Sequence, residues 1–260
     1  MPNKNRSLSP SAINAYEWCP AQWLGTYELR LPGTEFKATP DVAVGKAVHR
    51  AMAKLNQKRK EGKPVSSVEL QTWARDYWKE ERAEIPGTSA MSEDEDQNYS
   101  NWSAMHAAAL AGVTRGQVPD IIERYGSMPL QDDWYIGGQQ DAVLADGTVI
   151  DYKTAISKAF TNKDKERYRL QAAIYAAVIR HERGFLPEVH LVFSDTKTVE
   201  DWNVPLTPTS VDDALEHASR IATEIDKLLM NGTPFPRGRG ECRYCPLAGN
   251  CPQTIAPLAA

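Results

Sequence analysis

Two aspartates and one lysine lie close together in the middle of this 260-residue chain. Asp141 ends the run Gly137-Gly138-Gln139-Gln140-Asp141, and the other two residues belong to Ile150-Asp151-Tyr152-Lys153. Two carboxylates that converge can hold Mg²⁺ or Mn²⁺, because these cations prefer oxygen ligands. A lysine beside such a metal can position or deprotonate a water, or stabilise charge on a phosphoryl group. These residue types therefore indicate the chemistry that phosphodiester hydrolysis needs.

Two predicted strands would bring the three residues together. Residues 134–145 and 148–154 have the pattern of strands, and Asp146-Gly147 between them is a strong hairpin signal. Side chains two apart on a strand share a face, so Asp151 and Lys153 point the same way, and the hairpin brings Asp141 alongside. Asp-x-Lys is also a common charged pair on surface strands, but an acid directly across a tight hairpin favours the functional interpretation.

Three residues on predicted helices fit the same site. His49 lies on a helix expected over 41–59, although a lone histidine on an apolar helix is usually a core or surface residue. Gln171 and Tyr175 are four apart on a helix expected over 163–183, so they share one face. On their own these two are ordinary helix residues.

A basic run follows the lysine and is a candidate phosphate-binding patch. Over residues 156–169 the positive charges outnumber the negative ones by three; the basic residues are Lys158, Lys163, Lys165, Arg167 and Arg169. Lys163 and Arg167 are the residues expected to contact DNA. A solvated, charged helix start explains the same run equally well.

Four cysteines form the second candidate site. Cys242, Cys245 and Cys251 are close in sequence, whereas Cys19 lies 223 positions before Cys242. In a cytoplasmic chain this spacing indicates a metal site rather than a disulfide framework. A single Cys-x2-Cys pair with one remote cysteine favours an iron–sulfur cluster, and zinc is the alternative. The site, residue 19 with 237–252, would clip the N-terminal helix to the C-terminal tail.

The amino-acid composition limits the classes of protein to which the chain can belong. Hydrophobic residues make up 42% and charged residues 25%, which is typical of a globular chain that can bury a sizeable core. The net charge of −4 means that any contact with DNA has to come from local basic patches. No apolar run is long enough to cross a bilayer and no secretory signal is found, so we expect no membrane partner and a cytoplasmic location.

The order of elements predicts an α/β protein with a central mixed sheet flanked by helices. A helix is expected to begin at Ser9-Pro10, and a second, capped by Asp41, is expected over 41–59. Further helices are expected over 66–84, 98–125, 163–183 and 208–230. Residues 86–97 are expected to form a solvated acidic loop. The strands are expected over 134–145, 148–154, 189–194 and 199–204. We expect one domain over 1–260, with a helical insertion over 62–128.

The motifs follow one another in a definite order: Gly45-x-x-x-His49, Gly138-x-x-Asp141, Asp151-x-Lys153 and Gln171-x-x-x-Tyr175. In this order they resemble the RecB-like branch of the PD-(D/E)XK nucleases. With one cysteine before them and Cys-x2-Cys-x5-Cys after them, the chain looks like the iron–sulfur nucleases of that branch. These include the AddB nuclease domain and CRISPR-associated RecB-like exonucleases, with relatives in phages. Each motif is weak alone, whereas the ordered set of five is specific and spans Cys19 to Cys251.

The resemblance implies a restriction-endonuclease-like core and a role for each matching residue. It implies that His49, Asp141 and Asp151 bind Mg²⁺ or Mn²⁺, with the Tyr152 backbone carbonyl as a further ligand, and that Lys153 is the catalytic lysine. Gln171 and Tyr175 match a motif associated with DNA binding and with organising the site. The cysteines that would hold a 4Fe–4S cluster are Cys19, Cys242, Cys245 and Cys251.

The expected function is a metal-dependent DNA exonuclease that acts on single strands or duplex ends in recombination, repair or processing. One alternative is an endonuclease that trims DNA, as in CRISPR adaptation. Another is a module that binds DNA ends with a dormant site, although competent residues at every expected catalytic position argue against it. The chain has no Gly-x-x-x-x-Gly-Lys-Ser/Thr loop, so a helicase or recombination motor would be a separate chain. The sequence does not set the oligomeric state.

Overall fold

The computed structural model describes residues 6–32, 39–85, 91–238, 242, 245, 247, 250 and 251. The chain forms two compact units. Unit 1 contains Met1–Lys37, Ser127–Gly138 and Thr209–Ala260, and unit 2 contains Ala38–Gly126 and Gln139–Pro208. Every residue predicted for the nuclease site belongs to unit 2, and all four cysteines belong to unit 1. The assignment of the whole chain to one nuclease domain stays a prediction.

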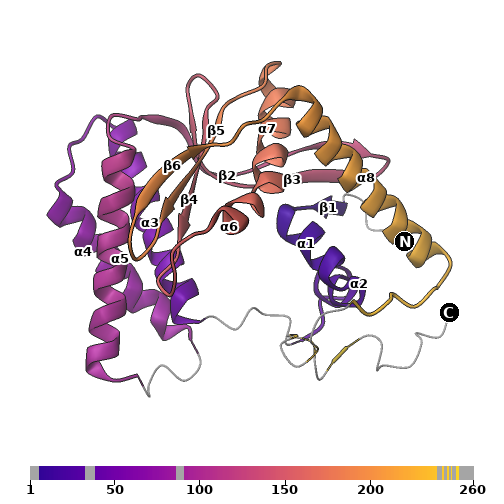
Figure 1. Cartoon of the computed structure of the whole chain (residues 1–260), viewed down its shortest axis with the longest axis horizontal. Helices are drawn as coiled ribbons and strands as arrows, with labels where there is room; N and C mark the ends of the chain where they lie inside the picture. Colours follow the sequence, from indigo (N-terminus) through magenta and orange to yellow (C-terminus); the bar gives the residue numbers. More distant parts are fainter. Residues whose placement is uncertain are drawn as a thin grey trace. The chain divides into compact units, whose positions relative to one another are not determined.

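The sheet is mixed, as the sequence predicts. Its strand order is β1-β3-β4-β5-β6, with β2 pairing β3, and the bounds are β1 Arg6–Leu8, β2 Pro119–Gln131, β3 Trp134–Leu144, β4 Val149–Thr154, β5 Val189–Ser194 and β6 Val199–Asn203 (Figure 1). The β1–β3 and β4–β5 pairs are parallel, whereas β3–β4 and β5–β6 are antiparallel. Most residues of β4 and β5 are buried, which means that this part of the sheet is covered on both faces.

The β3–β4 hairpin is confirmed. Gly147 has φ +92°, which suits glycine, and Asp146 Oδ1 accepts a hydrogen bond of 2.9 Å from the Thr148 N–H across the turn. Ala142 pairs with Ile150, and Val143 pairs with Val149. Extending this register by one residue places Asp141 opposite Asp151. The turn chemistry thus sets the alignment of the two acids.

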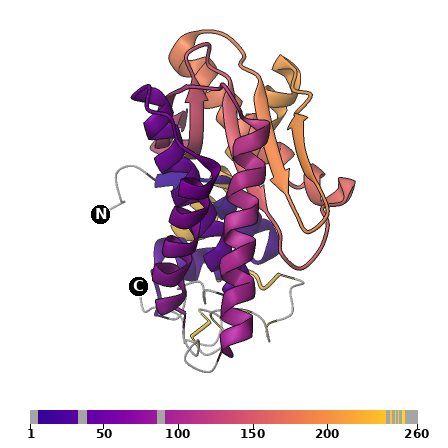
Figure 2. The same ribbon diagram turned by 90° about the vertical axis from the view of Figure 1, so that its left-hand side faces the viewer.

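Three long helices pack together in unit 2: α3 Pro40–Lys60, α4 Ser67–Ala83 and α5 Glu93–Val113 (Figure 2). The cap of α3 is Thr39 rather than Asp41, because the Thr39 hydroxyl accepts a hydrogen bond of 3.4 Å from the Val42 N–H and Pro40 takes the first helical position. Asp41 instead lies in the first turn, where a negative charge favours the helix dipole. α3 contacts β4, and α5 contacts β5 and β6.

Two predicted boundaries around α5 were wrong. The acidic run 93–96, expected in a loop, is the first turn of α5, and Ser92 with Glu95 forms a reciprocal capping box there. Residues 86–90, the start of the predicted loop, lie outside the described residues. The helix expected over 98–125 ends at Val113, and β2 begins at Pro119. The helical part of 62–128 therefore stops before β2.

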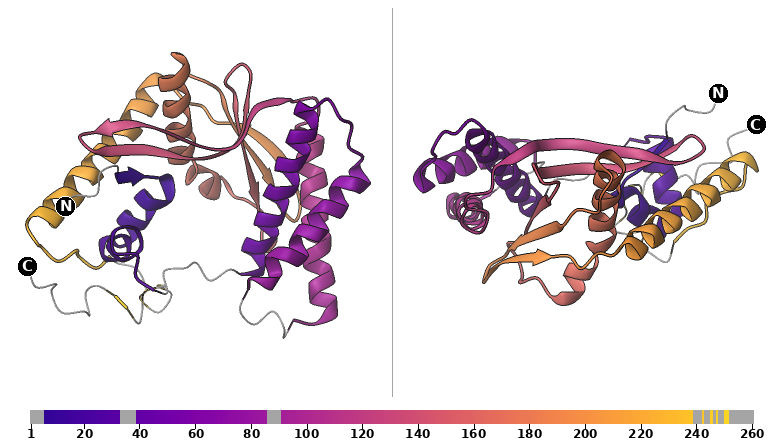
Figure 3. Two further views of the ribbon diagram at one scale, coloured as in Figure 1. Left: turned by 180° about the vertical axis from the view of Figure 1, so that it is seen from behind. Right: turned by 90° about the horizontal axis from the view of Figure 1, so that it is seen from above.

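The remaining helices agree more closely with the sequence. The helix expected over 163–183 is divided into α6 Asn162–Glu166 and α7 Arg169–Arg183 (Figure 3). Gly184, at φ +81°, ends α7. α1 Pro10–Trp18 begins after the Ser9 cap, as expected, and α2 Pro20–Trp23 and the π-helix η1 Leu24–Glu28 follow. α8 spans Pro208–Met230. Within the described ranges, no helix combines the length and apolarity needed to cross a membrane.

A buried polar contact fixes α3, which carries His49, against β4. Asn56 is fully buried, and its Nδ2 donates a hydrogen bond of 3.2 Å to the Tyr152 hydroxyl. Arg59 contacts Asn56 Oδ1 at 3.4 Å and also donates to the Ala111 carbonyl on α5 at 3.1 Å. Because buried polar groups are costly without partners, this network specifies one placement of the helix on the sheet.

Replacing Tyr152 by phenylalanine should therefore lower the free energy of unfolding. The change leaves the buried Asn56 donor without its acceptor, which costs about 1–3 kcal/mol. Urea unfolding followed by circular dichroism measures the effect, with Tyr27→Phe as the control because the Tyr27 side chain is partly exposed. Equal losses in the two variants would contradict a structural role for the Asn56–Tyr152 bond.

Candidate active site

Asp141 lies at the centre of the candidate site. Its side chain is buried, with Oδ1 3.1 Å from His49 Nδ1 on α3. Its Oδ2 accepts a hydrogen bond of 2.7 Å from the backbone N–H of Tyr152 on β4. A Cβ atom at Gly45 would be 3.4 Å from Thr154 Oγ1, so α3 runs close to the end of β4. The structure thus brings His49 to the acid from a distant part of the sequence.

Asp151 and Lys153 form the second half of the site. Lys153 Nζ lies 2.7 Å from Asp151 Oδ2, and the Asp151 side chain is only 3% exposed. The ammonium group also lies 4.7 Å from the centre of the Tyr168 ring, within the range of a cation–π contact. The strand places both side chains on one face, as predicted, and Tyr168 is a contact that the sequence did not suggest.

Gln171 and Tyr175 support the acids from α7. Gln171 Nε2 donates hydrogen bonds to Asp151 Oδ1 at 3.2 Å and to the Tyr175 hydroxyl at 2.6 Å. The Tyr175 hydroxyl in turn donates to the Gln139 carbonyl on β3. Tyr175 is 2% exposed, so in this structure its contacts are with the protein. The pair organises the site, and the predicted contact of these residues with DNA stays a prediction.

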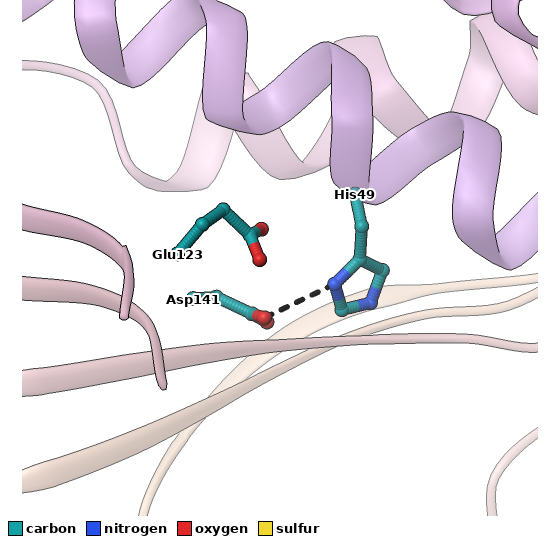
Figure 4. A group of neighbouring side chains, drawn as sticks. All are labelled: His49, Glu123 and Asp141. Carbon is teal, nitrogen blue, oxygen red and sulfur yellow. Dashed lines mark hydrogen bonds and ion pairs between the residues drawn. The ribbon is translucent and has the colours of Figure 1, made fainter. Parts of the chain in front are cut away.

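Glu123 is a site residue that sequence reasoning missed. Ligand atoms of His49, Glu123 and Asp141 all lie within 4.8 Å of one another, and the two carboxylates face each other beside the imidazole (Figure 4). Glu123 lies on β2, in a stretch that the sequence analysis took for helix, so nothing placed it beside β3. The signal that could have found it is the run Pro119-Asp120-Ile121-Ile122, which begins a strand.

The charges in the site are strongly coupled. Burial alone lowers the pKa of His49, but the charge of Asp141 and the hydrogen bond to it outweigh burial and raise the pKa to about 9. Burial raises the pKa of Asp141, and the positive His49 more than reverses that effect. Burial also raises the pKa of Asp151. Lys153 keeps a raised pKa because Asp151 and Asp141 offset its burial.

The donor set suits a hard divalent cation. His49, Glu123 and Asp141 form a candidate metal group of one imidazole and two carboxylates. The resemblance named Asp151 in place of Glu123, and the structure shows Asp151 in contact with Lys153 and Gln171. Tyr152, whose carbonyl was expected as a further ligand, lies in β4 and directs its N–H to Asp141. The arrangement can hold a metal next to a lysine ammonium group.

The basic run after β4 is largely engaged in ion pairs. Lys158 lies 2.9 Å and Arg167 3.8 Å from Asp164, and Lys165 lies 2.5 Å from Glu200. Arg169 pairs with Glu166. These contacts reduce the charge that the run offers to a phosphate. That Lys163 and Arg167 contact DNA stays a prediction.

The four cysteines all belong to unit 1, and the structure has them as thiols rather than joined in disulfides. Cys19 Sγ accepts a hydrogen bond of 3.3 Å from the Gly238 N–H. Burial raises the pKa of the Cys245 thiol, and the neighbouring charges of Cys19, Cys251 and Cys242 raise it further. The remote cysteine and the three C-terminal ones are therefore close enough to interact through their charges.

Comparison with known proteins places this fold and site in a family. The model of the PD-(D/E)XK nuclease superfamily matches residues 7–252. The chain belongs to the PD-(D/E)XK nuclease superfamily. The match includes all the motifs that the sequence analysis singled out.

A solved structure shares the fold at low sequence identity. A protein from Eubacterium rectale described as a "putative exonuclease" aligns with a TM-score of 0.59 and 16% identity, over 94% of this chain and 88% of that chain. A structure of the protein SSO0001 aligns with a TM-score of only 0.38 and 16% identity, over 91% of this chain and 97% of that one. No curated protein sequence matches the chain.

The His49–Asp141 pair predicts a pH dependence of the metal-free protein. The folded-state pKa of His49, about 9, lies above its ordinary value of 6.5. The stabilisation is therefore complete below pH 6.5 and is lost as the pH rises through 9. Melting temperatures in EDTA should fall across this interval more steeply for the wild type than for His49→Gln. Parallel curves would show that the two side chains are not coupled in solution.

Proposed function

We propose that this protein is a metal-dependent DNA exonuclease of the RecB-like branch, acting on single strands or duplex ends in recombination, repair or processing. The observation that carries the proposal is the β3–β4 hairpin with Asp141 tied to the backbone beside Asp151 and Lys153. His49 completes the set from α3. The superfamily supports a nuclease, and the exonuclease activity is our proposal.

His49, Asp141 and Asp151 would hold Mg²⁺ or Mn²⁺, and the Tyr152 carbonyl is the further ligand that we propose. Their oxygen-rich donor set with one imidazole fits either ion. When bound, the metal supplies Lewis-acid stabilisation of the charge that develops on the phosphoryl oxygens. Metal binding competes with the proton on His49, since a ligand imidazole has to be neutral.

Lys153 acts as a fixed positive charge in this proposal. Its raised pKa keeps the ammonium group protonated, and Asp151 and the Tyr168 ring hold it in place. As a water oxygen attacks phosphorus, one P–O bond forms and the P–O bond to the leaving sugar oxygen breaks. The water releases a proton, and the leaving sugar oxygen takes one up to become a hydroxyl. The ammonium group would donate a hydrogen bond to the phosphoryl group as its negative charge grows. Gln171 holds Asp151 through its other carboxylate oxygen.

The substrate and partners are proposed on the same basis. Lys163 and Arg167 are the proposed phosphate contacts beside the site, and Gln171 and Tyr175 shape it. A helicase or recombination motor, if one takes part, would be a separate chain. Cysteine thiols that are not joined in disulfides are typical of a reducing compartment, and we propose on this ground that the protein acts in the cytoplasm.

Lys153→Ala and Asp151→Asn should reduce metal-dependent cleavage of end-labelled DNA by about 10³-fold, because they remove charge stabilisation and a metal ligand. Lys63→Ala is the matched control, since it deletes an exposed lysine that pairs only with Glu61 in the described contacts. Mn²⁺ and Mg²⁺ should each restore activity after EDTA treatment.

The product pattern separates the candidate activities. An exonuclease shortens linear strands from the labelled end and spares circular single strands, whereas an endonuclease cuts the circles. Wild-type protein that binds DNA ends but cuts no substrate would identify a dormant end-binding module instead. Full activity in Lys153→Ala would contradict the assigned site.

We also propose that Cys19, Cys242, Cys245 and Cys251 hold a 4Fe–4S cluster. The charge interaction among the four thiols and the contact between Gly238 and Cys19 support it. A Cβ atom at Gly238 would be 1.8 Å from the Trp18 carbonyl oxygen, so the tail approaches the end of α1 too closely for any side chain. Closing this long loop would remove on the order of 5 kcal/mol of unfolded-chain entropy. Four thiolates also suit zinc.

Protein purified without oxygen should be brown and contain about four irons per chain. Cys19→Ala should lose the iron as completely as Cys245→Ala, because each would remove one ligand. Gly238→Ala should also lose iron, since its Cβ atom would push the tail away from Cys19. Gly112→Ala, at a glycine inside α5 with open space around it, is the control for glycine replacement as such. One tightly bound zinc and no iron would contradict the cluster.

A further inference from the structure

We propose that Glu123 is a direct ligand of the divalent cation in the active site. This inference rests on the proposed function, because it concerns the same metal. It adds a carboxylate from β2 to the ligands on α3, β3 and β4. The sequence motifs do not include this residue.

The position of the side chain is the first argument. Glu123 contributes a carboxylate oxygen to a group whose three ligand atoms all lie within 4.8 Å of one another (Figure 4). The other two members, His49 and Asp141, already meet at 3.1 Å. One small cation among the three atoms could contact all of them after small side-chain movements.

The backbone of Glu123 is the second argument. Its φ is +48°, in the left-handed region that residues with a side chain rarely adopt. The other two non-glycine residues with positive φ in the described ranges are Arg30, just after η1, and Asp132, in the β2–β3 turn. Glu123 alone of the three lies inside a strand. A left-handed residue there redirects its side chain, and such strain concentrates at functional sites.

A chain of hydrogen bonds holds the carboxylate in place. Gln139 Nε2 donates to Glu123 Oε2 at 3.1 Å, and the Gln139 carbonyl accepts from Tyr175. Tyr175 accepts from Gln171, which donates to Asp151. Glu123 is thereby connected to the second catalytic acid through β3 and α7. Partners of this kind orient metal ligands in proteins.

Charge balance is the third argument. Glu123 and Asp141 are two carboxylates beside one imidazole. The adjacent Arg124 does not neutralise Glu123, since it is directed to Gln140 and Glu182. Among the described residues no lysine or arginine forms an ion pair with Glu123, and the nearby His49 pairs with Asp141. A divalent cation would offset the two negative charges that the fold brings together.

The test is calorimetric titration of metal-free protein with Mn²⁺. Glu123→Gln should weaken the Kd at least about tenfold, as loss of even an indirect partner of a metal does. Asp120→Asn is the matched control, because it removes one negative charge from the same strand at an exposed position. It should leave the Kd within about twofold, since a screened surface charge acts weakly.

A second variant separates binding from folding. Glu123→Gly removes the carboxylate and suits the left-handed backbone, so in EDTA it should melt no lower than Glu123→Gln. It should bind Mn²⁺ as weakly as Glu123→Gln does. An unchanged Kd in both variants would overturn the proposal even if the wild type cleaves DNA. Weakened binding in both variants, with no cleavage by the wild type, would support Glu123 as a ligand and refute the nuclease.

Discussion

The hydrogen bond from the Tyr152 N–H to Asp141 is the contact on which the site depends. It joins the acid of β3 to the strand that carries Asp151 and Lys153, at a length of 2.7 Å. The short turn at Asp146-Gly147 sets the register, and a slip of one residue would turn the acid to the opposite face. The position of the first acid relative to the second is thus built into backbone pairing. The relative position of the two acids therefore depends little on side-chain flexibility.

Burying two acids has consequences throughout unit 2. A carboxylate removed from water needs hydrogen bonds or a positive partner, and each acid has both. Asp141 has His49 and a backbone N–H, while Asp151 has Lys153 and Gln171. The packing of α3 and α7 against the sheet therefore also brings His49 and Gln171 to the two acids. The same contacts that stabilise the fold thus set the electrostatics of the site.

How well the sequence predicted each element depends on whether neighbouring residues or distant ones determine that element. The hairpin, the Ser9 cap and the ends of α4 and α8 depend on neighbouring residues, and they could be predicted. The acidic run after Ser92 was assigned to a loop because of its charge, although Ser92 and Glu95 have the spacing of a capping box. Glu123 could not be placed because pairing of β2 with β3 is a tertiary interaction. His49 was predicted as a metal ligand only from the order of the motifs, because no local pattern connects it to Asp141.

Unit 1 is assembled from three stretches that are far apart in the chain, Met1–Lys37, Ser127–Gly138 and Thr209–Ala260. Arg6 of β1 pairs with Asp226 on α8, and the Ala21 N–H donates to the Pro236 carbonyl. During synthesis on a ribosome, β3 emerges about one hundred residues after the N-terminal segment, and α8 and the tail emerge about two hundred residues after it. Most of unit 2 has been made by then and can fold first. The N-terminal segment therefore lacks part of its packing until α8 and the tail have been made.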